Sequence, residues 1–287
     1  MNMTESTVGA ALAQAAARLR AVAERPHLEA ERLLAAVLGR ERPWLLAHPE
    51  APLAAEALAD FWTRVERRLA HEPLPYLLGE AEFFGLSFRV TPAVLIPRPE
   101  TEQLVELALA WLRAHPQARR VADVGTGSGC IAVSVAYHAP LVQVEALDIS
   151  AEALEVARGN AQRHGVADRV YFHQGHLLEP LITAVDVLLS NPPYVADEAW
   201  LDLPPSVQRE PRLALLGGKA GLDLIAALLE QAPRVLKPGG LLLLEIGAQQ
   251  GAAVLALAQA AFPGAKGEVL RDSFGLERFL RVELEKT

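Results

Sequence analysis

The sequence predicts an α/β protein in which a small helical bundle precedes a parallel β-sheet covered by helices on both faces. Two observations support this prediction. Residues 8–71 repeat apolar positions at spacings of three and four, with Glu and Arg between them, as amphipathic helices do. From residue 99 onward, strands of four to six apolar residues alternate with helices of about a dozen residues, which is typical of strand–helix–strand units.

Composition narrows the functional classes. The 287 residues are 51% hydrophobic and 22% charged, which suits one large domain and a smaller one. The 27 Lys and Arg against 35 Asp and Glu give a net charge of −8, so we expect no direct DNA binding. A single cysteine allows no internal disulfide and no thiolate metal site, and it suits a reducing compartment.

No targeting or membrane-spanning segment is evident in the sequence. Its start, MNMTESTVGA, lacks a basic stretch followed by a long apolar core. No uncharged apolar run approaches the roughly 20 residues that span a bilayer. We therefore expect a cytoplasmic protein that makes no membrane contact.

Changes in the pattern of apolar, aromatic and proline residues divide the chain into three regions. We expect a helical bundle over residues 1–75, a β-hairpin connector over 76–98 and the α/β domain over 99–287. The bundle contains the segments AALAQAAARLRAVAE, HLEAERLLAAVLGR and LAAEALADFWTRVERRLA, separated by prolines. Aromatic and branched residues on both sides of Gly85 predict the hairpin, and the α/β domain opens with a helix over 101–114.

A glycine-rich turn follows the first strand of the α/β domain. That strand ends at Asp123 and runs into DVGTGSG, and the next helix starts near Ile131. Glycines at such a turn let a ligand approach the backbone, and the helix N-terminus adds free N–H groups. Asp148 ends the following strand, where a carboxylate can accept hydrogen bonds from both hydroxyls of a ribose. Together these features predict a cofactor that contains a nucleoside.

The spacing of the glycines favours S-adenosyl-L-methionine over a nicotinamide dinucleotide. Gly125, Gly127 and Gly129 alternate with other residues, whereas the dinucleotide motif places its third glycine three positions after the second. Asp123 suits a cofactor with an α-amino group, because its carboxylate can hold an ammonium. We therefore expect a methyltransferase, whose product is S-adenosyl-L-homocysteine.

A segment poor in backbone donors follows the apolar strand over 185–189. In VLLSNPPYVAD, neither Pro192 nor Pro193 has an N–H group, so Asn191 Oδ1 and the Pro192 carbonyl are acceptors without competing donors. Two acceptors match the two hydrogens of a planar –NH₂ group, and the Tyr194 ring can stack on a flat substrate. The segment predicts methylation of an amino or amide nitrogen, with Asn191, Pro192 and Tyr194 as catalytic residues.

Five segments together resemble the peptide chain release factor N5-glutamine methyltransferases. They are VLIPRPETEQLVE (94–106), DVGTGSGCIAVSVA (123–136), ALDISAEALEVARGNA (146–161), LLSNPPYV (188–195) and EPRLALLGG (210–218). The resemblance covers nearly the whole chain, including LEAERLLAAVLG in the bundle. NPPY is shared with adenine-N6 nucleic-acid methyltransferases and with ribosomal-protein glutamine methyltransferases, and the run over 97–102 singles out the release-factor enzymes.

The resemblance implies a Rossmann-like, seven-strand class I methyltransferase domain behind a bundle that helps to dock the release factor. The implied substrate is the glutamine of the Gly-Gly-Gln motif of class 1 release factors. The implied substrate residues are Asn191, Pro192, Pro193 and Tyr194. The implied cofactor residues are Asp123, Gly125, Thr126, Gly127, Ser128, Gly129, Asp148 and Asn191.

The chain departs from the family pattern at a few positions. His176 and Leu177 stand where the family usually has an acidic residue and often an aromatic one near the adenine, and Ala220 replaces a usual Asp. The rival hypotheses are an adenine-N6 nucleic-acid methyltransferase, against which the acidic composition argues, a ribosomal-protein glutamine methyltransferase, and a protein that binds the cofactor without turnover. The intact NPPY segment argues against the last of these.

Several other side chains are expected to be structural. His173 and His176 flank a loop after a strand and have no Cys or acidic partner at ligand spacing, so we expect no metal site. Cys130 is expected to pack against the sheet. The tryptophans in helical patterns are expected to be core or interdomain contacts. The arginines of the third bundle helix are expected to form a solvated face; they are Arg64, Arg67 and Arg68.

Overall fold

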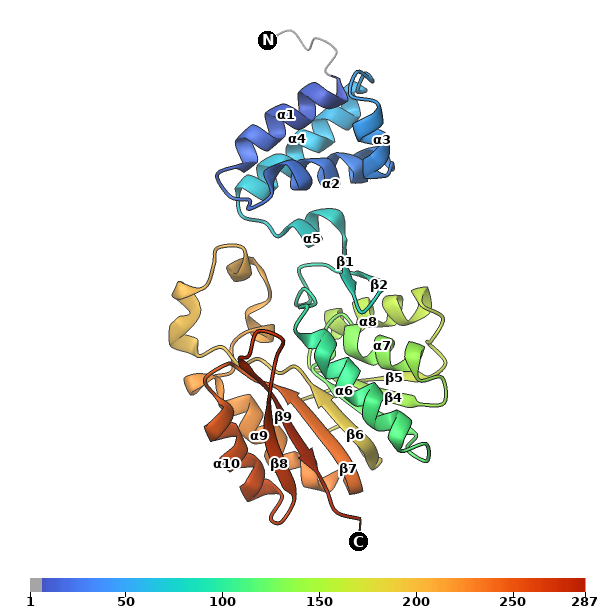
Figure 1. Ribbon diagram of the computed structural model, residues 1–287, viewed down its shortest axis with the longest axis vertical. Helices are drawn as coiled ribbons and strands as arrows, with labels where there is room; N and C mark the ends of the chain where they lie inside the picture. The colour runs from blue at the N-terminus through green and yellow to red at the C-terminus, as the bar shows by residue number, and fades with distance from the viewer. Residues whose placement is uncertain (1–6, 287) are drawn as a thin grey trace. The chain divides into compact units, whose positions relative to one another are not determined.

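The computed structural model describes residues 7–286, so the start MNMTES, on which the expectation about targeting rests, lies outside the described residues. The described chain divides into two compact units (Figure 1). The first comprises the residues up to Glu80 together with Pro204–Arg209, and the second comprises Ala81–Leu203 and the residues from Glu210 onward. In the described residues no helix is long and apolar enough to cross a membrane.

The first unit is helical. Its helices are α1 (Val8–Leu19), α2 (Pro26–Leu38), α3 (Arg42–Ala47), α4 (Ala55–Leu69) and α5 (Leu74–Leu78). Local signals set their ends, because the Thr7 hydroxyl accepts from the Ala10 N–H to cap α1 and Gly39, in the left-handed region, ends α2. Fully buried Leu33 and Phe61 belong to the apolar core of this unit.

The expectation that the three arginines of α4 form a solvated face is wrong for Arg68. Its side chain is buried, and it donates to Glu29 Oε2 at 2.7 Å and to the Val22 carbonyl at 3.0 Å. Arg67, by contrast, is exposed and pairs with Glu72. One helical turn carries both kinds of arginine because only one face of α4 meets α1 and α2.

The second unit contains a small hairpin and a seven-stranded sheet. The strands are β1 (Glu80–Phe83), β2 (Leu86–Arg89), β3 (Arg120–Val124), β4 (Gln143–Asp148), β5 (Val170–Gln174), β6 (Val185–Ser190), β7 (Leu236–Glu245), β8 (Lys266–Arg271) and β9 (Glu277–Glu283). The sheet order is β5-β4-β3-β6-β7-β9-β8, in which β9 runs antiparallel to both neighbours and the other pairs are parallel. This is the predicted α/β architecture with an antiparallel edge.

Helices cover both faces of this sheet, as the alternation of strands and helices predicted (Figure 1). Helices α6 (Thr101–Ala114), α7 (Cys130–His138) and α8 (Ala151–Arg163) pack into the core on one face, and α9 (Asp223–Gln231) and α10 (Gly251–Ala261) into the core on the other. The strands between them are buried on both sides, which explains their continuous apolar runs.

The hairpin β1–β2 packs into the core of the second unit. Phe83 and Phe88 are almost fully buried and contact each other edge to face within the core formed by α6 and α7. Phe84 and Gly85 have positive φ values of 50° and 72° at the turn, which glycine adopts without steric cost. The segment expected to connect the domains therefore contributes aromatic side chains to a core.

The parallel register brings four strand ends to one edge of the sheet. Val124 of β3 pairs with Leu147 of β4 and with Ser190 of β6, and Ser190 pairs in turn with Leu244 of β7. Between β6 and α9 the chain forms short 3₁₀ helices. They are η1 (Asp197–Asp202), η2 (Val207–Arg209), η3 (Arg212–Ala214) and η4 (Lys219–Gly221), and η5 (Ala232–Arg234) follows α9. Ligands of open α/β sheets bind at this carboxyl edge.

Candidate active site

The glycine turn after β3 forms an open backbone cradle. Gly125, Gly127 and Gly129 have φ values of 72°, 54° and 80°. A Cβ at Gly129 would lie 3.0 Å from the Ala157 Cβ, so this glycine allows α8 to pack closely. A Cβ at Gly125 would meet no heavy atom within 4 Å, and one at Gly127 only the Gly125 carbonyl at 3.9 Å. The backbone at these two positions therefore leaves room for a ligand.

Buried Asn160 fixes the position of this cradle. Its Nδ2 donates to the Ser128 carbonyl at 2.8 Å and to the Arg89 carbonyl at 3.0 Å, while its Oδ1 accepts from the Arg89 N–H at 2.8 Å. These bonds join the glycine turn to β2 through α8. The hydrogen-bonding capacity of the Asn160 amide is therefore used within the protein.

Asp123 is a fully buried carboxylate with one unused oxygen. Its Oδ2 accepts from the Thr126 hydroxyl at 2.6 Å and from the Ala132 N–H at 3.1 Å, while Oδ1 has no partner within residues 7–286. Burial raises the pKa of Asp123 to about 7, although the bonds from Thr126 and Ala132 oppose the shift. A cation beside Oδ1 would satisfy the atom and favour its charged form. The buried Ser128 hydroxyl likewise lacks a protein partner in the described part of the chain.

Asp148 ends β4 beside the same turn. Its Oδ2 accepts from the Gly127 N–H and its Oδ1 from the Ser150 N–H, both at 2.9 Å. The side chain is half-buried, and burial raises its pKa. A carboxylate offers about four acceptor positions, so the two backbone bonds leave capacity for two hydroxyl donors. Together with the open cradle and the orphaned Asp123 oxygen, this donor set fits a ribose and an ammonium.

Asn191, directly after β6, is oriented by protein contacts. Its Nδ2 donates to the Thr101 hydroxyl oxygen at 3.1 Å, and the Thr101 hydroxyl donates to Glu245 Oε2 at 2.6 Å. No donor in residues 7–286 reaches Asn191 Oδ1 or the Pro192 carbonyl. The two acceptors predicted from the sequence are therefore both unused by the protein.

Tyr194 belongs to the same hydrogen-bonded group. Its hydroxyl donates to Glu245 Oε1 at 3.3 Å, and burial together with the Glu245 charge raises its pKa well above the usual range. Its carbonyl accepts from Gln250 Nε2 at 3.0 Å. We call Asn191, Pro192, Pro193 and Tyr194 the clamp.

A glycine-rich segment supports the clamp from behind. A Cβ at Gly217 would collide with the Pro193 carbonyl, and one at Gly221 with the Tyr194 carbonyl. The Gly217 N–H donates to the Val195 carbonyl at 2.8 Å. Only residues without a side chain allow this close approach, which gives Gly217 and Gly221 a structural role.

Two of the sequence segments singled out above meet in space. Glu210 is buried, and its carboxylate accepts from the Ile96 N–H at 3.0 Å and from Arg98 at 2.6 Å. This contact joins the segment before α6 to the one after η2, although 112 residues separate Arg98 from Glu210. This ion pair, in which Glu210 is buried and Arg98 is partly exposed, ties down the segment that leads into Thr101.

The remaining candidates lie outside this group. The expectation that His173 flanks a loop is wrong, because it lies within β5, and its Nε2 is 2.7 Å from Glu145 Oε2 of β4. His176 lies 3.5 Å from Glu179. Among residues 7–286, no three His, Cys, Asp or Glu side chains gather as a metal site. Cys130 is buried against the sheet as predicted, and burial raises its pKa to about 12.

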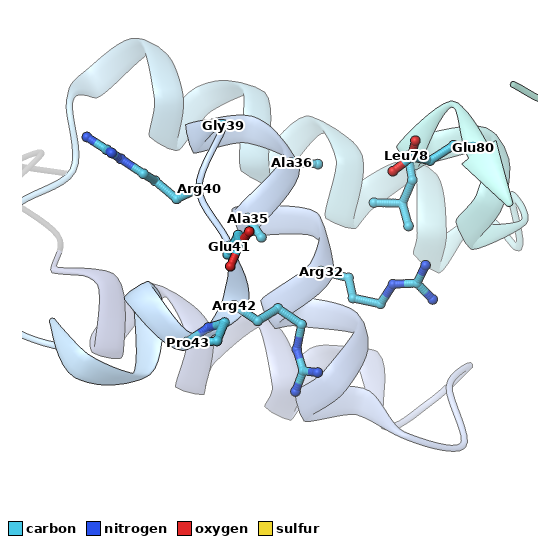
Figure 2. A pocket seen from close by; sticks show the side chains of 10 residues that line it. All are labelled: Arg32, Ala35, Ala36, Gly39, Arg40, Glu41, Arg42, Pro43, Leu78 and Glu80. Atoms are coloured by element: carbon cyan, nitrogen blue, oxygen red, sulfur yellow. The ribbon is translucent and has the colours of Figure 1, made fainter. Parts of the chain in front are cut away.

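A separate cavity of about 590 Å³ lies in the helical unit. Figure 2 shows that the side chains of Arg32, Arg40 and Arg42 point in three different directions around it. The Arg42 guanidinium is bonded to Glu31, and the Arg40 guanidinium lies over the Trp44 ring. The positive groups therefore do not converge on one ligand, and the cavity does not resemble an anion site.

Sequence reasoning missed three residues that contact the clamp. Thr101 is hydrogen-bonded to Asn191. Glu245 accepts from the hydroxyls of Thr101 and Tyr194. Gln250 donates to the Tyr194 carbonyl. Glu245 carried a usable signal, since it is the polar residue that ends the apolar strand β7 at the functional edge.

The chain matches known families over both units. One matching model is described as the PrmC N-terminal domain, over residues 10–79, and another as the Methyltransferase small domain, over residues 102–203. Of the solved structures, a methyltransferase from Pyrococcus furiosus has a TM-score of 0.52 at 19% identity, over 78% of this chain and 99% of that one. The T. thermophilus 16S rRNA N2 G1207 methyltransferase in complex with AdoMet and guanosine has a TM-score of 0.51 at 17% identity, over 72% and 50%. These two structures show the fold alone.

Curated relatives share more of the sequence. The release factor glutamine methyltransferase of Moorella thermoacetica is 48% identical over 98% of this chain and 100% of its own length. That of Nitratidesulfovibrio vulgaris is 41% identical over 96% and 95%. The resemblance inferred from the motifs is thus confirmed, and the chain belongs to the release factor glutamine methyltransferase family.

Proposed function

We propose that the protein transfers a methyl group from S-adenosyl-L-methionine to the side-chain amide nitrogen, N5, of the glutamine in the Gly-Gly-Gln motif of class 1 release factors. The observation that carries the proposal is the pair of unused acceptors, Asn191 Oδ1 and the Pro192 carbonyl, beside an open glycine cradle. Membership of the family supports the choice of a release factor over a nucleic acid.

We assign cofactor binding to the carboxyl edge of β3 and β4. The unpaired Asp123 oxygen would hold the α-ammonium, and Asp148 would hold the ribose hydroxyls. The cradle would let the cofactor lie directly against the backbone of the glycine turn. The cradle residues are Gly125, Thr126, Gly127, Ser128 and Gly129, and Asn191 lies at its border. When bound, S-adenosyl-L-methionine supplies an electrophilic methyl group on a sulfonium.

The clamp would hold the acceptor nitrogen for that reaction. An amide nitrogen is a poor nucleophile because its lone pair is delocalised, so positioning contributes more than proton removal. Asn191 Oδ1 and the Pro192 carbonyl would accept both N–H bonds, which fixes the plane of the amide. The same acceptors would stabilise positive charge that develops on the nitrogen, which would then release one of its protons to solvent and become a neutral amide again. The Pro193 and Tyr194 positions would enclose the flat amide, with the Tyr194 ring against its face.

The helical unit would contribute to docking of the release factor, as the family resemblance implies. The domain assignment of residues 1–75, 76–98 and 99–287 is proposed on the same basis.

The test is methyl transfer from labelled S-adenosyl-L-methionine to a purified class 1 release factor. Parallel reactions contain a release factor whose Gly-Gly-Gln glutamine is replaced, and duplex DNA. Label on the intact release factor alone supports the proposal. Label on DNA would mean that the clamp recognises an exocyclic amine of adenine, and equal label on both release factors would move the acceptor to another residue.

A further inference from the structure

Thr101 and Glu245, which lie on the Nδ2 side of Asn191, fix the direction of the hydrogen bonds of its amide. Glu245 ends β7, and its Oε2 lies 2.6 Å from the Thr101 hydroxyl oxygen. The Thr101 and Tyr194 hydroxyls both donate to this carboxyl group, one to each oxygen, so the single proton of the Thr101 hydroxyl points to Glu245. The Thr101 oxygen then has only lone pairs left for its second neighbour, the Asn191 side chain at 3.1 Å.

This leaves one orientation for the Asn191 amide. The –NH₂ group must face Thr101, and the carbonyl oxygen must face the opposite way, where no donor of residues 7–286 reaches it. A flipped amide would place an oxygen against the Thr101 lone pairs and leave Thr101 without a donor. A buried polar group that loses its partner costs about 1–3 kcal/mol, which is enough to exclude the flipped form.

Contacts on Glu245 keep its own position fixed. The Tyr194 hydroxyl donates to its second oxygen at 3.3 Å, so two hydroxyls converge on one carboxylate. Burial raises the pKa of Glu245, and the Thr101 bond and the positive charge of Arg278 oppose that shift. Arg278 is itself held by Asp272 at 3.1 Å. The carboxylate is therefore a satisfied member of a network and does not itself reach for substrate.

We propose that Thr101, held by Glu245, is a specificity-determining positioning residue that fixes the Asn191 amide with its oxygen toward the acceptor and so makes the site select glutamine over glutamate. The proposal rests on the proposed function and names its specificity mechanism. Two fixed acceptors attract the –NH₂ of glutamine. They repel the carboxylate of glutamate, which has no donor to offer.

The experiment measures binding rather than turnover. Affinities of a class 1 release factor and of its acceptor Gln→Glu variant are measured by titration with S-adenosyl-L-homocysteine present, so that no transfer occurs. Docking contacts elsewhere are common to the two ligands and cancel in the ratio. A site built on two acceptors should prefer glutamine by at least about 100-fold in the wild type.

Thr101→Val keeps the shape of the side chain and removes the hydroxyl. We expect the ratio to fall by about tenfold, because the Asn191 amide can then turn its –NH₂ toward glutamate. Thr101→Ser restores the hydroxyl and should restore the ratio. Thr63→Val, which removes a hydroxyl bonded to the Ala59 carbonyl in α4, is the matched control and should leave the ratio unchanged.

Glu245→Gln tests the other end of the network, and it replaces Thr101→Val if that variant does not fold. An amide at position 245 can offer either an acceptor or a donor to Thr101, so the ratio should fall here as well. A wild type that transfers no methyl group to the release factor would contradict the proposed function itself. A wild type that transfers the methyl group but binds the two release factors equally would overturn only the inference. A wild-type preference that Thr101→Val or Glu245→Gln leaves intact would overturn only the inference, as would a Thr101→Ser ratio as low as that of Thr101→Val.

Discussion

Affinity for S-adenosyl-L-methionine should rise as the pH rises from about 5.5 to about 7. In the free protein, burial raises the pKa of Asp123 to about 7, and the form that can pair with an ammonium is the ionised one. Binding of a cation next to the unpaired Oδ1 lowers that pKa, so binding releases a proton. An equilibrium that releases a proton is favoured at higher pH, which fixes the sign of the effect.

The structure also gives the size of the effect. With a pKa of about 7, the ionised fraction of Asp123 increases from about 3% at pH 5.5 to about 50% at pH 7, so the dissociation constant should fall by about 16-fold. The α-amino group of the cofactor, with an ordinary pKa near 7.7–8.0, stays mostly protonated across this interval. The change in affinity therefore reports on the protein carboxylate.

Isothermal titration calorimetry in buffers of different ionisation enthalpy measures both the affinity and the number of protons released. Asp123→Asn should bind more weakly and lose most of the pH dependence. Asp148→Asn is the matched control, because a carboxylate that binds neutral hydroxyls gains little charge interaction and the pH dependence should persist. A dissociation constant that is flat between these pH values, with no proton released, would refute the assignment of Asp123 to the ammonium.

Three further outcomes follow from the structure. Asn191→Ala should lower kcat on a release factor by about 10²–10³-fold at saturating cofactor while the cofactor dissociation constant changes little, and comparable turnover would remove the residue from the reaction. Gly221→Ala should lower the free energy of unfolding by about 2–4 kcal/mol and also lower kcat, because the new Cβ collides with the clamp. The control Gly275→Ala, at φ 80° with no neighbour within 4 Å, should lower it by only about 1–2 kcal/mol in denaturant titrations and leave kcat intact. Glu29→Ala should destabilise the helical unit by about 3–5 kcal/mol, since it leaves the Arg68 charge buried and unpaired. If Glu29→Ala melted at the same temperature as the Glu29→Met, Arg68→Met double variant, this prediction would be contradicted.

Most of the architecture could be predicted from the sequence because periodicity reports burial directly. The helix over 101–114, the strand ending in Asp148 and the turn at the three glycines were predicted within a residue or two of the structure. The spacing of residues along the chain does not show which strands are neighbours in the sheet. The contact between His173 and Glu145 could therefore not be predicted from the sequence. Glu145 lies one strand away on β4, 28 residues earlier in the chain.

The clamp shows the same limit more sharply. The unused acceptors of NPPY could be predicted from the sequence, because proline has a carbonyl but no N–H group. Their orientation depends on Thr101 and Glu245, which are 144 residues apart and meet only because β6 and β7 pair in parallel behind α6. A pattern within one segment can predict which groups are available. Only the packing of α6 against β7 brings together the residues that orient the Asn191 amide.

The two buried carboxylates at this edge of the sheet differ in how far the protein satisfies them, and the difference matches their proposed roles. Glu245 accepts from two hydroxyls and lies in the field of Arg278, so both of its oxygens have protein partners. Within residues 7–286 Asp123 has partners on one oxygen only, and burial, which no cation of these residues offsets, raises its pKa to about 7. A carboxylate whose oxygens are both bonded holds its neighbours rigidly, whereas one with an orphaned oxygen gains most from an external cation. The distribution of satisfied and unsatisfied oxygens thus separates the residue proposed to position the clamp from the residue proposed to bind the cofactor.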